Sequence, residues 1–309
     1  MTNAGDGSAA PDVDELVRLD FEVDPAATLA ELSKGRGDPT IRIERGIVWR
    51  ALRTAEGPAT TRLAQARDGW RVSAWGPGAA AAVAAVPRTL GSEDDPSALE
   101  LPPGPLRDLA ARSLGMRFGR TDAVWPSLLP AICGQKVTAT QAHRAYFGIV
   151  RRWGEEAPGS AGLRLAPRAE VVAALPYYEL HPVGLEQRRA ITLIRAAERA
   201  EWLEEATTMT PATALARLRG IPGIGAWTAA EVARPAFGDA DAVSIGDFHI
   251  PNMVCWALAG EARGDDARML ELLEPYRGQR ARVVRLIKHA GVTAPKYGPR
   301  LAPQRIEDI

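Results

Sequence analysis

A short glycine-rich turn between two amphipathic segments constrains this chain more than any other feature. The segment IPGIG, residues 221–225, separates a helix expected to end near Gly220 from one expected to begin at Ala226. Ile221 and Ile224 have the spacing to pack between the two helices. Glycine accepts positive φ and permits close approach of the backbone. The free amides at the start of the second helix, with its dipole, predict a site for an anion such as a phosphate.

Composition excludes several classes of protein. The 309 residues contain 46% hydrophobic and 25% charged residues, which is ordinary for a globular chain. No apolar run reaches the roughly 20 residues that cross a membrane. The polar start MTNAGDGSAAPD lacks the features of a signal peptide, so we expect a cytoplasmic protein with a disordered tail over residues 1–11.

The two cysteines, Cys133 and Cys255, are too few for a four-thiolate iron–sulfur cluster or a cysteine-rich zinc site. Such low cysteine usage is typical of a reducing compartment. We therefore expect neither a metal nor a cofactor.

Charge is unevenly distributed along the chain, although the net charge is zero. Residues 1–100 contain 11 basic and 16 acidic residues, and the remainder contains 27 and 22, so the two parts differ in sign. A basic face of this kind is typical of polyanion binding, although for a single basic helix a solvated surface is the favoured interpretation. The densest basic run contains no acidic residue and comprises Arg277, Arg280, Arg282, Arg285, Lys288, Lys296, Arg300 and Arg305.

Local patterns divide the chain into two regions of different secondary structure. Residues 12–100 mix a helix that begins after Asp24 with period-two strands, including a hairpin that turns at Asp68-Gly69. The polar, proline-rich stretch 91–105 is the predicted linker. Residues 101–309 are helical almost throughout. We therefore predict an α+β fold: a small antiparallel-sheet α+β domain followed by a mostly α-helical domain.

Four stretches together resemble one known family. LRGIPGIGAWTAAEVA (218–233) resembles the helix-hairpin-helix of the DNA glycosylase superfamily, expected at about 213–234, and AVSIGDFHI (242–250) resembles the loop that bears its aspartate. LLPAICGQKVTATQA (128–142) is similar to a segment that presses on the DNA minor groove. LLEPYRGQRARVVRLI (272–287) is similar to the family's C-terminal helix. A preceding α+β domain points to the DNA-3-methyladenine glycosylase II branch.

This resemblance implies roles for particular residues. Asp247 stands at the position of the catalytic aspartate. The residues implied in the pocket for the extruded base are Trp227, Phe248, Tyr276 and Glu231. Those implied at the DNA backbone or groove are Gly220, Ile221, Gly223, Gly225, Gln135, Lys136, Thr138 and Arg277. The implied partner is double-stranded DNA with damaged bases, bound by a monomer.

Three positions depart from the family's pattern. Trp227 occupies the position where bifunctional members carry a Schiff-base lysine, which implies that this chain has no lyase step. Lys136 replaces a commonly apolar residue that wedges into the DNA stack. Glu231 replaces an aromatic residue of the base pocket, so the choice of base is open. The expected aromatic cage would bind a cationic, alkylated purine by stacking and cation–π attraction.

Each implied role has a simpler structural alternative. The carboxylate of Asp247 could stabilise an oxocarbenium-like transition state and orient water, or it could cap the helix that follows. Trp227, Phe248 and Tyr276 could be core residues, and Glu231 could lie on a solvated helix face. Thr138, with Gln141 three residues later, forms a predicted capping box, and Gln135 contacts DNA or caps a helix.

Three functions therefore remain open from sequence. The first is a monofunctional glycosylase that hydrolyses the N-glycosidic bond of alkylated purines such as 3-methyladenine. The second is a glycosylase for another lesion, such as a deaminated base. The third is a non-catalytic helix-hairpin-helix protein that binds DNA, for which Asp247 would be dispensable.

Overall fold

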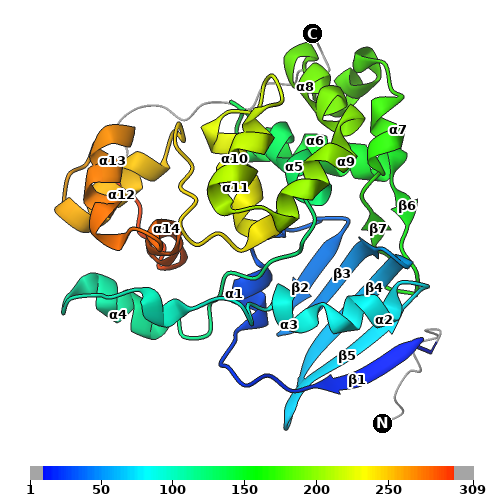
Figure 1. Ribbon diagram of the computed structural model, residues 1–309, viewed down its shortest axis with the longest axis horizontal. Coiled ribbons are helices and arrows are strands. Elements are labelled where there is room, and N and C mark those ends of the chain that lie inside the picture. The colour runs from blue at the N-terminus through cyan, green and yellow to red at the C-terminus, as the bar shows by residue number, and fades with distance from the viewer. Residues whose placement is uncertain (1–9, 296–309) are drawn as a thin grey trace.

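The computed structural model describes residues 10–295, so the predicted disordered tail lies outside the described residues except for Ala10 and Pro11. The N-terminal region forms one five-stranded antiparallel sheet in the order β1-β5-β4-β3-β2 (Figure 1). This sheet confirms the α+β class. Its strands are β1 (Val13–Val17), β2 (Ile41–Glu44), β3 (Ile47–Thr54), β4 (Gly57–Ala66) and β5 (Gly69–Trp75).

Alternation of side chains explains how the sheet builds its core. Val48, Leu63 and Val72 stand opposite one another in register on three neighbouring strands, and all three are buried. The predicted hairpin at Asp68-Gly69 is confirmed as the β4–β5 turn. Helices of this region are α1 (Pro25–Leu29), capped by Asp24 as predicted, α2 (Ala79–Ala84) and α3 (Val86–Thr89).

The rest of the described chain is mostly helical. A small hairpin, β6 (Glu155–Glu156) and β7 (Arg164–Leu165), packs Leu163 and Leu165 against Ala51 of the large sheet. The α-helices are α4 (Pro105–Arg112), α5 (Trp125–Cys133), α6 (Ala139–Trp153), α7 (Ala169–Ala173), α8 (Gln187–Glu198), α9 (Ala200–Glu204), α10 (Pro211–Arg219), α11 (Ala226–Phe237), α12 (Ile250–Ala259), α13 (Asp266–Leu273) and α14 (Arg280–His289). Short 3₁₀ helices are η1 (Pro96–Ala98), η2 (Tyr177–Val183), η3 (Glu205–Thr208) and η4 (Glu274–Tyr276).

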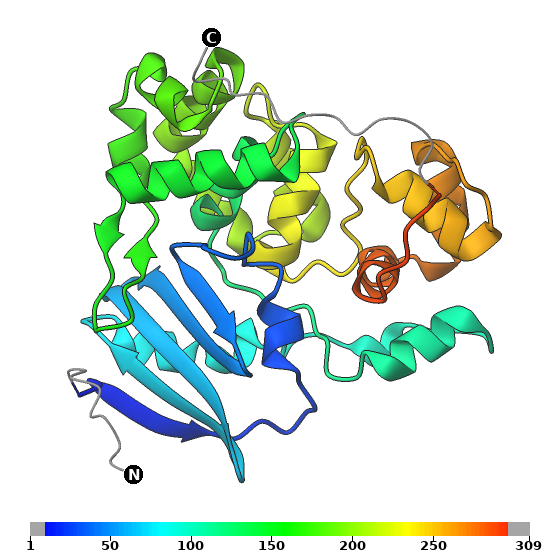
Figure 2. The same ribbon diagram turned by 180° about the vertical axis from the view of Figure 1, so that it is seen from behind.

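These helices form two separate groups. Helices α5 to α11 share a large apolar core, whereas α12, α13 and α14 form a smaller group around Val254, Met269 and Leu273. Figure 1 shows the smaller group beside α10 and α11, and Figure 2 shows α1 between the sheet and α14. The loop of residues 238–249, hereafter the Asp247 loop, joins the two groups. Its geometry therefore depends on how the groups are held.

Three residues of the basic run, Arg280, Arg282 and Arg285, face inward, which corrects their interpretation as part of a basic binding face or a solvated helix, whereas Arg277 and Lys288 are exposed. Arg282 pairs with Asp94 of the predicted linker, and each side chain is only 4% exposed. Arg285 donates to backbone carbonyls of α1, and Arg280 pairs with Asp241. These charges hold the fold together. Lys296, Arg300 and Arg305 lie outside the described residues.

Candidate active site

A cleft of about 2090 Å³ lies between the N-terminal sheet region, the helical core and the smaller helical group. Residues from all three parts of the molecule line it. Those relevant to the predicted site are Glu31, Lys34, Gln135, Lys136, Thr138, Gly223, Gly225, Trp227, Glu231, Asp247, Phe248, Arg285 and Lys288. Clefts at the junction of domains are a common place for binding and catalysis.

The helix-hairpin-helix forms where the glycine-rich turn predicted it. Helix α10 ends at Gly220, which is exposed and does not line the cleft, and α11 begins after Gly225. Ile221 and Ile224 are both buried between the helices, as expected. Gly223 has a φ of +100°, and a Cβ there would collide with the Thr192 hydroxyl. Only glycine fits this position without strain.

Gly225, unlike Gly223, does not use the positive φ that glycine permits. Its backbone is extended, with φ of −95° and ψ of −173°, and open space surrounds the position of a Cβ. Gly225 therefore serves as an N-cap residue without a side chain, which leaves the first amides of α11 open toward the cleft. The free amides at the start of α11 are the donors that the predicted anion site requires.

Gln135 ties the end of α5 to the hairpin. Its side-chain nitrogen donates to the carbonyl of Gly223 and to the hydroxyl of Thr228, each at 2.9 Å. It caps no helix, so one of its two predicted roles is wrong. The next residue, Lys136, is exposed and has a φ of +54°, a conformation that is unusual for a residue with a Cβ. The capping box of Thr138 and Gln141 is present.

The carboxylate of Asp247 contacts two elements at once. Its Oδ1 accepts hydrogen bonds from the amides of His249, at 2.7 Å, and Ile250, at 2.9 Å, at the start of α12. Its Oδ2 accepts one from the indole nitrogen of Trp227 at 3.0 Å. His249 is the N-cap residue of α12, so Asp247 is not the N-cap residue itself, but its carboxylate accepts from the first amides of the helix while also facing the cleft. The two alternatives for this residue are compatible.

The predicted pocket aromatics take different positions. Trp227 is half-buried, and a Cβ added at Gly134 would lie 3.1 Å from its indole ring, so its ring lies close to the end of α5. Phe248 is 75% exposed at the cleft, with its ring edge-on to His249. Tyr276 packs into the core of the smaller helical group and does not line the cleft. The structure therefore gives no support to Tyr276 as a pocket residue.

Arg277 also lies away from the cleft. Its guanidinium is exposed and pairs with Glu274. Lys288 is also exposed, but unlike Arg277 it lines the cleft. Among the positive charges of α14 and its preceding turn, Lys288 is therefore better placed than Arg277 to meet a polyanion at the cleft.

Glu231 belongs to a buried network instead of a solvated helix face. Its Oε1 accepts from the Arg234 guanidinium and from the Ser244 hydroxyl, each at 2.6 Å. Burial by itself raises the pKa of Glu231, but Arg234 and Ser244 outweigh it and lower the pKa to about 2. Lys34 also lines this wall, and burial lowers the pKa of its ammonium. Glu231, Arg234 and Lys34 thus form a charged wall of the cleft, and Glu231 lies one helical turn from Trp227.

Sequence analysis missed several residues that shape the site. Asp266 accepts from the amide of Gly246, and Asp241 accepts from the amides of Gly278 and Arg280. Glu31, Lys34 and Arg234 reach the cleft from elements far apart in the sequence. Their contacts join residues that are far apart in the sequence, such as Asp266 with Gly246 and Asp241 with Gly278, so no local pattern indicated them.

No helix in the described part of the chain is long and apolar enough to cross a membrane. Within residues 10–295, no group of three or more histidine, cysteine or carboxylate side chains has the arrangement of a metal site.

Comparisons with known proteins identify the fold. No protein-family model matches the sequence, and a search of curated proteins finds no significant match. The structure is similar to a 3-methyladenine DNA glycosylase from Archaeoglobus fulgidus, with a TM-score of 0.74 and 21% identity over 88% of this chain and 97% of that one. MBOgg1 in complex with a low-affinity DNA ligand gives a TM-score of 0.71 and 14% identity, covering 92% and 99%.

A third similar structure is the 8-oxoguanine glycosylase/lyase of Clostridium acetobutylicum, with a TM-score of 0.70 and 11% identity over 92% of this chain and 98% of that one. These chains are covered almost completely, so the likeness includes the sheet as well as the helices. The chain therefore has the fold of helix-hairpin-helix DNA glycosylases. The narrower assignment to the DNA-3-methyladenine glycosylase II branch stays a prediction.

The ionisation of Glu231 makes a prediction for stability. A pKa lowered from 4.5 to about 2 stabilises the folded state above pH 4.5, and this stabilisation is lost as the pH falls toward 2. We expect Glu231→Gln to lower the free energy of unfolding at neutral pH by about 3 kcal/mol, and by less than about half of that at pH 3. Urea unfolding at both pH values measures this, with Glu198→Gln on the exposed face of α8 as the control. A pH-independent difference would contradict it.

Proposed function

We propose that this protein is a monofunctional DNA glycosylase that hydrolyses the N-glycosidic bond of a damaged base in double-stranded DNA. The observation that carries the proposal is the position of Asp247. Its carboxylate lies at an open cleft, held by Trp227 of the hairpin helix and by the amides of α12. The fold, shared with several DNA glycosylases, supports the same reaction class.

The geometry fits the chemistry of this reaction. Leaving of the base builds positive charge on the sugar, and a carboxylate near the anomeric carbon stabilises that charge and orients the attacking water. Asp247 is fixed by three N–H donors, so little reorganisation is needed when the charge develops. The target base must leave the stack to reach this carboxylate, and the cleft provides the space.

Binding of the DNA backbone is assigned to the hairpin and to the residues around it. The open amides after Gly225 suit a phosphate, because backbone donors grip DNA without reading its sequence. Lys136 and Lys288 add exposed positive charge at the cleft. The proposed partner is duplex DNA with a damaged base, bound by a monomeric, cytoplasmic protein.

Alkylated purines are the first proposed substrates. A cationic base would stack on Trp227, whose ring face attracts a cation, whereas the charge of Glu231 is already paired with Arg234. Alkylation also makes the base a good leaving group, so no strong general acid is needed. A. fulgidus 3-methyladenine glycosylase shares the fold, which is consistent with this choice.

A base with polar edges, such as a deaminated purine, is the second candidate. The cleft wall that contains Lys34, Glu231 and Arg234 offers charged donors and acceptors where an aromatic residue was expected. Such a wall favours hydrogen bonding to a polar base edge. The fold is also shared with an 8-oxoguanine glycosylase/lyase, which acts on an oxidised base. A non-catalytic DNA-binding role is the third alternative.

Replacement of Asp247 tests catalysis directly. Asparagine keeps one oxygen to cap α12 but loses the charge and the acceptor for the Trp227 indole, so Asp247→Asn is expected to fold and to release base from methylated duplex DNA at least about 100-fold more slowly. Single-turnover release of free base measures this, with the exposed Asp20→Asn as control. Unchanged release by Asp247→Asn would exclude the proposed mechanism and leave the non-catalytic alternative.

A panel of duplex oligonucleotides separates the two lesion classes. We expect the fastest release from DNA that contains N-alkylated purines, because the charge of such a base is attracted by the ring of Trp227 and makes the base a good leaving group. Single-turnover rates for 3-methyladenine analogues, hypoxanthine and 8-oxoguanine, measured in one buffer, provide the comparison. A faster rate for hypoxanthine or 8-oxoguanine would favour the polar-edge candidate.

Trp227, at the position where bifunctional glycosylases carry a lysine, predicts that the DNA strand is not cleaved after base release. Without a lysine there, no Schiff base forms, so the product is an intact abasic strand. We expect base release with no strand cleavage and no covalent complex after borohydride treatment. A trapped protein–DNA complex would show that another amine, such as Lys34 at the cleft wall, performs lyase chemistry.

A further inference from the structure

The Asp247 loop joins two bodies that share no continuous core. Before it lies α11, in the large helical core, and after it lies the smaller group of α12, α13 and α14. The loop holds Asp247 between them, with one oxygen bound to α11 through Trp227 and the other to the start of α12. A shift of one body against the other would therefore move this carboxylate.

On the first side of the loop, Arg234 of α11 connects three segments. Its Nη1 donates to the carbonyl of Ala242 at 3.2 Å and to the hydroxyl of Ser244 at 2.8 Å, both within the Asp247 loop. Its Nε donates to Oε1 of Glu31 at 3.1 Å, and Glu31 follows α1 in the N-terminal domain. One guanidinium thus fixes the loop to that domain.

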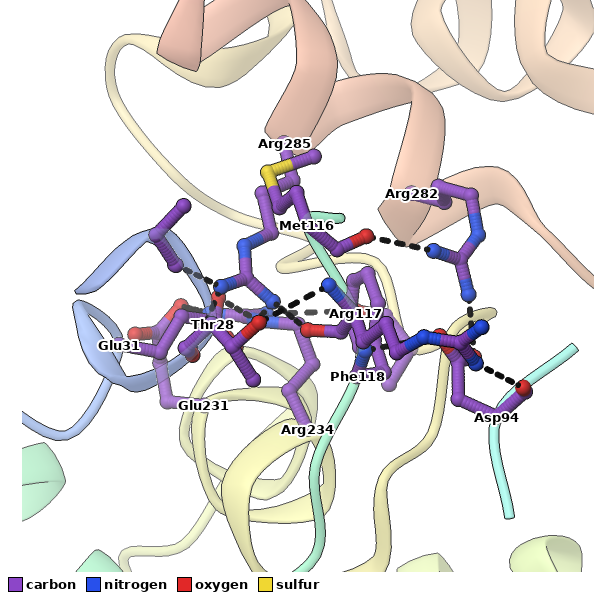
Figure 3. Close-up of polar contacts among 12 residues, drawn as sticks. Thr28, Glu31, Asp94, Met116, Arg117, Phe118, Glu231, Arg234, Arg282 and Arg285 are labelled. Carbon is purple, nitrogen blue, oxygen red and sulfur yellow. Dashed lines mark hydrogen bonds and ion pairs between the residues drawn. The ribbon is translucent and has the colours of Figure 1, made fainter. Parts of the chain in front are cut away.

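On the second side, Arg285 of α14 reaches the same place. Its Nη2 donates to the carbonyls of Ala27 at 2.6 Å and Thr28 at 2.9 Å, in α1. Its Nη1 lies 3.8 Å from Oε2 of Glu31. Figure 3 shows Arg285 from above and Arg234 from below meeting beside Glu31, with Arg282 and Asp94 as a second attachment of α14.

We propose that Glu31 is a positioning residue for Asp247, because its two carboxylate oxygens each hold an arginine from one side of the Asp247 loop. The N-terminal region then has a defined role in the reaction. Through Glu31 it holds Arg234 and Arg285 on the two sides of the Asp247 loop, an arrangement hereafter called the bracket, and it fixes the distance between Asp247 and the hairpin. This inference rests on the proposed function only for its consequence in catalysis. The contacts of Glu31 with the two arginines belong to the fold and do not depend on that function.

Burial makes this bracket strong. The side chains of Glu31, Arg234 and Arg285 are 25%, 14% and 10% exposed, so water screens their attraction poorly. Burial alone would raise the pKa of Glu31, yet Arg234 and Arg285 outweigh it and hold the pKa below its ordinary value. Glu31 is therefore ionised at neutral pH and pairs with both arginines.

Hydrogen–deuterium exchange of the full-length protein tests the bracket independently of activity. Glu31→Gln keeps the shape but loses the charge, so the amides of Gly246, Asp247, His249 and Ile250 should exchange about tenfold faster, the effect of one lost charge-assisted contact. Glu15→Gln, an exposed change on β1, should leave them unchanged. Unchanged exchange in Glu31→Gln, or acceleration that is equal throughout the sheet, would overturn the proposal.

A second variant covers failure of the first to fold. Glu31→Asp retains the charge but is one methylene shorter, so it cannot reach both arginines. It should accelerate exchange in the Asp247 loop under the same criteria, and no acceleration would again overturn the proposal.

A double-mutant cycle tests the link to catalysis. Glu31→Gln should slow single-turnover base release about tenfold at unchanged DNA affinity, and it should have no further effect when added to Asp247→Asn. An equal loss in both backgrounds would show that Glu31 does not act through Asp247. If no DNA substrate releases base, the proposed function fails, whereas the exchange measurement still decides the role of Glu31.

Discussion

Buried ion pairs between distant segments are the constraint on which the arrangement of this molecule depends. Arg282 and Arg285 leave the C-terminal helix and enter the N-terminal domain, where Asp94, Glu31 and main-chain carbonyls receive them. Removing one partner from such a pair strands a charge in the interior, which is far more costly than losing a surface contact. The arginines therefore define a single relative placement of the sheet and the two helical groups.

Within that placement, one carboxylate combines a structural role with the catalytic role proposed for it. Asp247 begins α12 by accepting from two of its amides and at the same time binds the indole of Trp227. The requirement that a cap be rigid is also the requirement for stabilising charge in a reaction, because a preorganised group does not need to move. Arg234, paired with Glu231, also fixes the Asp247 loop by donating to the hydroxyl of Ser244.

Local rules account for most of what the sequence predicts correctly, and for its failures. The capping box at Thr138, the hairpin at Asp68-Gly69 and the helix-hairpin-helix each depend on residues a few positions apart. The contact of Glu31 with Arg234 spans 203 residues, and no local pattern encodes it. The basic run after Tyr276 was misinterpreted for the same reason, since a count of charges does not say which way a helix faces.

The left-handed backbone at Lys136 has a consequence of its own. A residue with a Cβ forfeits roughly 1–2 kcal/mol in that conformation, which glycine would avoid. Its neighbour Gln135 is held by Gly223 and Thr228, so the tip of this turn has little freedom to relax. The side chain of Lys136 therefore extends from a backbone segment that is held in place. If a DNA duplex binds at the cleft as proposed, it meets a lysine whose backbone is already fixed, so only the aliphatic part of the side chain remains to be ordered.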